Sequence, residues 1–149
     1  MSSEQGNGGG RIVVGVDSSD SSKAALAWAV RQAGLTGDAV EAIAAWQVPA
    51  VFGSVFTMTP ETSELDQGAR QALSEAVAEA EKLAPGVEIR ALVVQENPAR
   101  ALLSAAKGAE LLVVGSRGHG GFTEALLGSV GQHCVQHAEC PVVVVRGDR

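Results

Sequence analysis

Residues 113–128 contain five glycines and begin at the end of an apolar stretch. Glycine adds no side chain to a core and loses more backbone entropy on folding than any other residue, so such a cluster indicates that backbone approaches something closely. A glycine-rich loop between a strand and a helix presents backbone N–H groups in a concave array, and the helix N-terminus adds partial positive charge. This combination favours the binding of a phosphate group.

Other polar residues are expected near this loop. Gly128 interrupts the helical pattern and Ser129 stands where an N-cap would open the last helix, so a second group of amides is expected to face the first. Two such groups predict a ligand with more than one phosphate. Arg117 could clamp a phosphate or be solvated. Asp17, which follows the first apolar run, could cap a helix and line a crevice at once, since the two roles are compatible.

Two common phosphate-binding motifs do not fit these residues. A Walker A loop ends in Gly-Lys-Ser/Thr, whereas Lys23, Lys82 and Lys107, the lysines of this chain, all lie outside the glycine-rich loop. A Rossmann dinucleotide fingerprint requires Gly-x-Gly-x-x-Gly after the first strand, where this sequence has GVDSSD. Neither motif is therefore expected.

A segment near the C-terminus, HCVQHAEC, contains metal-binding residue types. His133 and His137 are four residues apart, with Cys134 and Cys140 close by. On a helix, however, His133 and Cys134 would point about 100° apart, and Cys140 precedes Pro141 at an expected strand start. No pair matches a known zinc spacing, so we interpret the thiols as buried and expect no metal or redox site.

The elements that must position these residues alternate along the chain. Short apolar runs rich in β-branched residues predict strands at residues 11–17, 39–46, 87–94, 109–115 and 140–146. Helical spacing predicts helices at 17–34, 97–108 and 129–138. It also predicts a long helix that follows a loop through Phe52 and Pro60 and is ended by Pro85 and Gly86. Gly34 predicts the end of the helix at 17–34, and Asn97 and Pro98 predict the start of the helix at 97–108. The long helix has an apolar stripe made of Ala69, Leu73, Ala76, Ala80 and Leu83.

This alternation predicts a doubly wound α/β fold. Right-handed crossovers place five parallel strands in one sheet with helices on both faces. In such sheets ligands bind beyond the carboxyl ends of the strands, where the strand order reverses. Asp17 and the glycines that begin at Gly115 would share one crevice if the first and fourth strands are neighbours.

Length and charge narrow the class of protein. The 149 residues suit a single domain, expected at residues 11–146, with a disordered tail at 1–10 and a short tail at 147–149. A net charge of -6 and eleven scattered basic residues argue against nucleic acid as a partner. No apolar run approaches the roughly 18 residues that span a bilayer, and two cysteines fit a reducing compartment. We therefore expect a cytoplasmic protein with no membrane partner.

The motif residues resemble those of the universal stress proteins. Nucleotide-binding members carry Gly, two residues, Gly, nine residues, then Gly and Ser or Thr, and this chain has Gly115, Gly118, Gly128 and Ser129 at that spacing. The stretches VVGVDSS and CPVVVVR extend the resemblance over residues 11–146.

The resemblance implies a Rossmann-like sheet of strand order 3-2-1-4-5 and a regulator that binds ATP. It assigns Gly115, Gly118, Gly128, Ser129 and Val130 to the phosphates and ribose, Asp17 to the ribose, and the backbone around Gly15 and Trp46 to the adenine. Trp46 departs from the small aliphatic residue that is commoner in the family.

Three functions follow as hypotheses: a nucleotide-binding regulator, a slow ATP-hydrolysing enzyme and a dimeric adaptor without nucleotide. ATP is expected to bind with Mg²⁺ and to turn over slowly or not at all, because the crevice offers no P-loop lysine. His119 and Glu124 lie in the loop without a visible catalytic partner. The family's strand order places the last strand at an edge, so Val142, Val143, Val144 and Val145 are expected to pair with a second copy in a homodimer.

Overall fold

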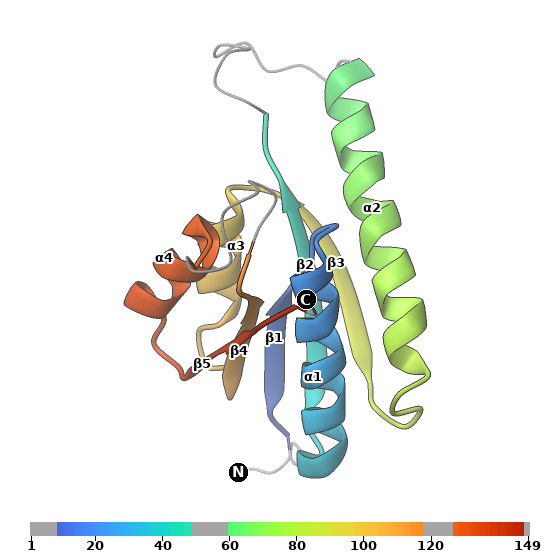
Figure 1. The fold of residues 1–149 in the computed structure, drawn as a ribbon, viewed down its shortest axis with the longest axis vertical. Helices are drawn as coiled ribbons and strands as arrows, with labels where there is room; N and C mark the ends of the chain where they lie inside the picture. The colour runs from blue at the N-terminus through green and yellow to red at the C-terminus, as the bar shows by residue number, and fades with distance from the viewer. Residues whose placement is uncertain (1–8, 49–59, 118–126, 148–149) are drawn as a thin grey trace.

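The predicted α/β fold is confirmed by a computed structural model that describes residues 9–48, 60–117 and 127–147. Its five strands are all parallel and lie in the order β3-β2-β1-β4-β5, as Figure 1 shows. The strands are β1 (Arg11–Gly15), β2 (Ala39–Trp46), β3 (Ile89–Gln95), β4 (Leu111–Gly115) and β5 (Val142–Val145). Since β1 and β4 are neighbours, the sheet reverses its winding between them.

Two helices cover each face of the sheet (Figure 1). The helices are α1 (Asp20–Thr36), α2 (Pro60–Glu81), α3 (Pro98–Ala105) and α4 (Ser129–His137). Alternate residues of β1 point to opposite faces: Ile12 and Val14 pack under α1 and α2, and Val13 packs under α3 and α4. All three side chains are fully buried, so the sheet separates two apolar layers.

The first helix begins and ends through local signals, but not at the predicted glycine. Ser19 is the N-cap, and its hydroxyl accepts a hydrogen bond from the backbone N–H of Ser22. The helix continues past Gly34 to Gly37, whose φ of 86° places it in the left-handed region. Gly34 was therefore the wrong stop: it lies inside the helix, where an added Cβ would be 3.6 Å from Ala84 Cβ, an ordinary contact distance.

The second helix is shorter at its C-terminal end than the sequence pattern predicts. It ends at Glu81, so Leu83 lies beyond it and is 47% exposed, although the sequence analysis placed that leucine in the apolar stripe. Leu73, Ala76 and Ala80 are buried, as the stripe requires. The stripe therefore ends one turn earlier than predicted.

The third helix has a side-chain cap at each end. Asn97 accepts a hydrogen bond from the N–H of Arg100 at 3.1 Å, as predicted. At the other end, the Arg11 guanidinium donates to the carbonyls of Ala105 (2.8 Å) and Lys107 (2.6 Å). A cation at a helix C-terminus offsets the negative end of the helix dipole, so this contact ties β1 to α3.

The fourth helix corrects the predicted N-cap. Gly128, in an extended conformation, is the N-cap and Ser129 is the first helical residue. No side chain caps this end, which leaves its first-turn amides facing outward. Within the part of the chain that the structure describes, none of the helices has the length and apolar character that crossing a membrane requires.

Candidate functional site

A cleft of about 460 Å³ lies at the carboxyl ends of the central strands, where the winding of the sheet reverses. This volume is within the range of small-molecule sites in proteins. The cleft is lined by Gly15, Val16, Asp17, Ser22, Ile43, Ala45, Pro98, Leu102, Val114, Gly115, Arg117, Gly128, Ser129, Val130 and Gly131. The structure thus brings together seven of the nine residues assigned from the sequence. Gly118 lies outside the described residues, and Trp46 does not line the cleft.

Two buried serines in the first turn of α1 hydrogen-bond to the backbone on both sides of the cleft. The Ser21 hydroxyl donates to the Arg117 carbonyl at 2.9 Å and accepts from the Arg117 N–H at 3.2 Å. The Ser22 hydroxyl bonds the carbonyl and the N–H of Asp17 in the same way, at 2.9 and 3.0 Å. A hydroxyl can donate and accept at once, so each serine satisfies two backbone groups. The sequence analysis missed both; the signal was the run DSSDSS, which has more serines than one helix cap needs.

Gly115 has a structural reason to be glycine. A Cβ built on it would lie 2.5 Å from Ser21 Oγ and 2.7 Å from the Ser21 carbonyl carbon, closer than non-bonded atoms approach. Gly147 approaches the same serine, with its own virtual Cβ 3.1 Å from Ser21 Cα. The first turn of α1 therefore packs directly on the backbone where β4 and β5 end.

The start of α4 presents to the cleft amides that have no hydrogen-bond partner among the described residues. The Gly128 N–H is already used, because it donates to the Ser116 carbonyl at 2.9 Å. The first hydrogen bond of the helix runs from the Gln132 N–H to the Gly128 carbonyl at 2.9 Å. The N–H groups of residues 129–131 therefore have no partner within the helix, and the helix dipole adds positive charge there. An anion would bind these amides rather than that of Gly128.

One carboxylate and one guanidinium also face the cleft. Asp17 is half-buried, and its Oδ1 accepts the Ser19 N–H at 2.8 Å, which fixes the carboxylate just before α1. The N-cap role discussed for Asp17 is taken by Ser19. Arg117 is half-buried, and no ion pair joins its side chain to another of the described residues. The cleft thus has a fixed negative group and an unpaired positive group at its rim.

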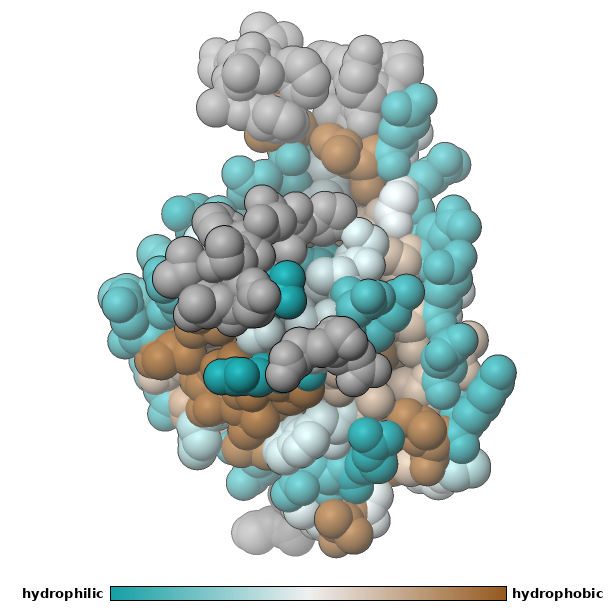
Figure 2. All heavy atoms as spheres, in the orientation of Figure 1, coloured by the Kyte–Doolittle hydropathy of each residue, from teal (hydrophilic) through white to brown (hydrophobic). Residues whose placement is uncertain are grey.

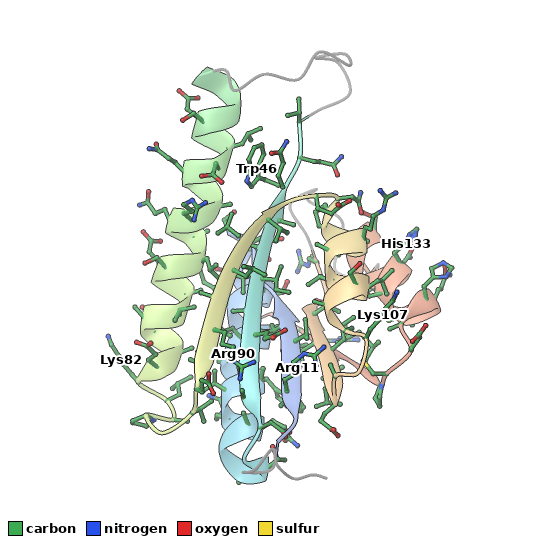
Figure 3. The ribbon with its side chains drawn as sticks, turned by 180° about the vertical axis from the view of Figure 1, so that it is seen from behind. Arg11, Trp46, Lys82, Arg90, Lys107 and His133 are labelled. Atoms are coloured by element: carbon green, nitrogen blue, oxygen red, sulfur yellow. The ribbon has the colours of Figure 1, made fainter. Side chains whose placement is uncertain are left out.

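Trp46 belongs to the opposite face of the sheet. Its indole Nε1–H donates to Asp66 Oδ1 of α2 at 3.0 Å, and Figure 3 shows the ring between the end of β2 and α2. The hydrogen bond from Arg70 holds the pKa of Asp66 below its ordinary value, and the indole adds to this effect. The Trp46 carbonyl accepts the Glu96 N–H at 2.8 Å, so it is directed to β3 and away from the cleft.

The neighbouring residue, Ala45, presents its backbone to the cleft instead. In a parallel strand, successive residues bond to opposite neighbours, and here Val16 N–H bonds Ile43 O while Glu96 N–H bonds Trp46 O. Ala45 therefore directs its N–H and C=O to the β1 side, where β1 has already ended. No hydrogen bond joins these two groups to another residue in the described ranges.

The two histidines and the cysteine of α4 point in different directions. His133 and His137 are exposed, with ring centroids 4.9 Å apart, whereas Cys134 is fully buried under the sheet. Burial raises the pKa of the Cys134 thiol to about 11, which keeps it protonated near neutral pH. Among the described residues, no group of three or more His, Cys, Asp or Glu side chains is placed to hold a metal ion.

The comparison with curated proteins finds universal stress proteins among the relatives of this chain. A universal stress protein of Mycobacterium tuberculosis is 38% identical over 135 residues, which cover 91% of this chain and 44% of the relative. A universal stress protein of Mycolicibacterium smegmatis is 36% identical over 135 residues, which cover 91% of this chain and 45% of that relative. The chain thus spans less than half the length of these relatives.

Solved structures with the same fold include universal stress proteins described in complex with a nucleotide. The universal stress protein UspA of Lactobacillus plantarum has a TM-score of 0.73 at 26% identity, covering 92% of this chain and 97% of that one. A universal stress protein described in complex with cAMP has a TM-score of 0.68 at 27% identity, covering 93% and 98%.

Another, from Archaeoglobus fulgidus in complex with dAMP, has a TM-score of 0.67 at 26% identity and covers 91% of this chain and 96% of that one. The model of the universal stress protein family matches residues 10–146. The cleft, the fold and these relatives lead to one conclusion: this chain belongs to the universal stress protein family.

Proposed function

We propose that this protein binds an adenine nucleotide, ATP with Mg²⁺, in the cleft and acts as a nucleotide-dependent regulator in the response to stress. One observation carries the proposal. Among the described residues, the backbone groups of Ala45 and the first amides of α4 have no hydrogen-bond partner, and apolar side chains line the cleft between them. A ligand with a flat polar-edged ring and a phosphate suits that arrangement.

The β2 side of the cleft suits adenine. The N–H and C=O of Ala45 form a donor and acceptor pair, which matches the N1 acceptor and N6 donor on one edge of the adenine ring. Ile43, Pro98 and Leu102 supply an apolar wall for the ring.

The α4 side suits the phosphates. Three amides and the Ser129 hydroxyl lie at the positive end of a helix, and Arg117 adds a full charge. Asp17 is the one carboxylate among the described lining residues, so it is the side chain that would face the ribose or a phosphate-bound Mg²⁺. The cAMP and dAMP named for two related structures are adenine nucleotides, which supports the same ligand class.

The lining residues support binding better than rapid hydrolysis. Lys23, Lys82 and Lys107 do not line the cleft, so no lysine there would neutralise charge as a phosphoryl group departs. We expect slow turnover or none. Release of phosphate at several turnovers per second would show an ATPase instead.

Ser129→Glu tests the phosphate end. Ser129 is exposed in the first turn of α4, where a carboxylate is compatible with the helix dipole, so the fold should remain stable. The same carboxylate would repel a phosphate and remove one hydrogen bond to a charged group, which is worth about 1.5–3 kcal/mol. Calorimetry should show ATP affinity reduced more than tenfold, with adenosine affinity changed less than threefold.

Gln132→Glu is the matched control, because Gln132 is exposed on the same helix and does not line the cleft. It makes the same change of net charge and should alter ATP affinity less than twofold. Equal losses in both variants would point to a general charge effect and contradict the proposed subsite. Failure of the wild-type protein to bind any adenine nucleotide would leave the adaptor hypothesis.

We also propose a homodimer through β5. This strand lies at the edge of the sheet, where its outer N–H and C=O groups have no strand partner within the chain's described sheet. Apolar side chains gather over β5 in Figure 2, and Val144 is 39% exposed whereas Val143 packs on the core. Val144→Lys is therefore a better test than a change at Val143, which would also disturb the core.

Sedimentation velocity at micromolar concentration should give a dimer for the wild type and a monomer for Val144→Lys. Leu35→Lys is the control, because Leu35 is 84% exposed at the end of α1 and lies far from β5 in the fold. It should leave the dimer intact. A wild-type monomer at these concentrations would contradict the proposal.

A further inference from the structure

Ser21 and Ser22 are two polar side chains that the fold buries almost completely, with 4% of each residue exposed. The start of α1 does not need them as caps, because Ser19 is the N-cap and accepts the Ser22 N–H at 3.2 Å. Burying a hydroxyl costs free energy unless it is hydrogen-bonded. The bonds that these two hydroxyls make therefore indicate what they are for.

Both hydroxyls lie where β1 and β4 separate. The pairing of these strands ends at Val14 of β1. Beyond it, the Val16 N–H bonds a carbonyl of β2 and the Ser116 N–H bonds a carbonyl of β5, each at 2.8 Å. Successive residues of a parallel strand direct their backbone groups to opposite neighbours. Asp17 and Arg117, the next residues, therefore turn their N–H and C=O toward the space between β1 and β4.

One serine meets each of these two backbone ends. The Ser21 hydroxyl donates to the Arg117 carbonyl at 2.9 Å and accepts the Arg117 N–H at 3.2 Å. The Ser22 hydroxyl serves the carbonyl and the N–H of Asp17 in the same way, at 2.9 and 3.0 Å. Each hydroxyl thus supplies the donor and the acceptor that a neighbouring strand would otherwise supply. The first turn of α1 fixes both chain segments at the point where the cleft opens.

The two fixed residues bring opposite charges to the cleft. Arg117 and Asp17 both line it, and both are half-buried. The residue before Arg117, Ser116, accepts the Gly128 N–H at 2.9 Å, so Arg117 is tied to the start of α4, where the phosphates are proposed to bind. Asp17 belongs to the end of β1 instead and is proposed to face the ribose. The two serines therefore act on different parts of the same ligand.

We propose that Ser21 is the positioning residue for the phosphate end of the nucleotide site, where it acts through Arg117. Ser22 has the corresponding role at the ribose end, where it acts through Asp17. This inference rests on the proposed nucleotide binding and adds that Ser21 sets the preference for ATP over adenosine without touching either. The reason is geometric: a guanidinium bonds a phosphate strongly only when its N–H groups meet the oxygens at the right angle.

Ser21→Ala and Ser22→Ala are a matched pair, because they remove the same atom from neighbouring and equally buried residues. Calorimetry with ATP and with adenosine, both in EDTA so that Mg²⁺ does not contribute, gives the ratio of the two affinities. Ser21→Ala should reduce ATP affinity at least fivefold and adenosine affinity less than twofold. Ser22→Ala should reduce both by a similar factor, so its ratio should stay within twofold of the wild type. A general loss of stability would lower the two affinities together and leave the ratio unchanged.

Arg117→Ala tests the route by which Ser21 acts. In that background Ser21→Ala should change ATP affinity less than twofold, because the side chain that it positions has been removed. If Ser21→Ala did not fold, Ser21→Cys would take its place. The thiol resembles the hydroxyl in shape but is a weaker donor and acceptor, so the ratio should fall in the same direction.

Three results would overturn the inference. These are an unchanged ratio in the Ser21 variant, equal changes of the ratio in the two serine variants, and an undiminished effect of Ser21→Ala when Arg117 is alanine. In each case a wild-type protein that binds ATP keeps the proposed function. A wild-type protein that binds neither ATP nor adenosine would instead refute the proposed function, and this inference with it.

Discussion

Gly115→Ala isolates the contact between the end of β4 and the first turn of α1. The new methyl carbon would lie 2.5 Å from Ser21 Oγ, 2.7 Å from the Ser21 carbonyl carbon and 2.8 Å from its oxygen. The hydroxyl could rotate away, but the two backbone atoms are fixed in a helix whose N-terminal side chains bond both strand ends. The methyl group can therefore be accommodated only if the helix moves from the sheet.

The expected cost follows from this geometry. Overpacking a rigid contact typically destabilises a protein by about 1–3 kcal/mol. The matched control is Gly68→Ala, in the interior of α2, where an added Cβ meets nothing within 4 Å. There the same substitution should stabilise the protein by about 1 kcal/mol, because alanine has a higher helix propensity than glycine. The two variants should thus change stability in opposite directions.

Urea unfolding followed by far-ultraviolet circular dichroism measures both values on one scale. Gly115→Ala should lower the midpoint without changing the slope, and Gly68→Ala should raise it. In thermal scans each kcal/mol corresponds to about 2–4 °C for a chain of this size. If Gly115→Ala were as stable as the wild type, the close approach of Ser21 to Gly115 would be refuted. The remaining role of the glycine would then be to let the backbone approach a bound ligand.

Three further predictions concern buried or paired groups. Ser21→Ala leaves the N–H and C=O of Arg117 without their buried partner and should cost about 1–3 kcal/mol in urea unfolding, whereas Ser74→Ala on the exposed face of α2 should cost under about 0.5 kcal/mol. The pKa of Asp66 is lower in the folded protein than its ordinary value of 3.8, so its contribution to stability is present above that pH and is lost as the pH falls. The pH dependence of the free energy of unfolding below pH 5 should therefore be weaker in Asp66→Asn. An unchanged profile would contradict the pairing of Asp66 with Arg70 and Trp46. The pKa of Cys134 rises from 9.0 to about 11 on folding, so stability should fall between pH 9 and 11. The fall should be smaller in Cys134→Ala, where only the raised pKa of Cys140 remains, when each protein is compared with its own value at pH 7.

Features with a local cause were predictable from the sequence. The bounds of β2 are those expected, because a run that is apolar except for Glu41 is flanked by polar residues at both ends. Asn97 caps α3 and Pro98 starts it, since both preferences depend only on the backbone of one helical turn. The order of strands came from the family resemblance, because alternation of elements does not fix which strands are neighbours.

The errors arise where distant parts of the chain decide a local outcome. Gly34 and Gly37 are both good helix stops by residue type, but only Gly37 takes the left-handed conformation that ends the helix. Likewise, the run AVEAIAAW is buried on both faces, so nothing in it indicates which face receives Trp46. That choice depends on α2, which supplies Asp66 as the indole's partner.

The serines of α1 show the same limit at the site itself. Composition identifies a helix start at DSSDSS, but not which hydroxyl caps the helix and which bonds the strands. Ser21 and its partner Arg117 are 96 residues apart in the chain. Their contact exists only because β4 pairs with β1, so the roles of these serines required the topology.

The hydrogen bond from the Gly128 N–H to the Ser116 carbonyl closes the chain on itself at the base of the glycine-rich loop. Loop-closure entropy grows with the logarithm of length, so doubling a flexible loop costs only about 0.6 kcal/mol. We therefore expect the sheet and helices to tolerate changes of chain length between these two positions at a small cost in stability.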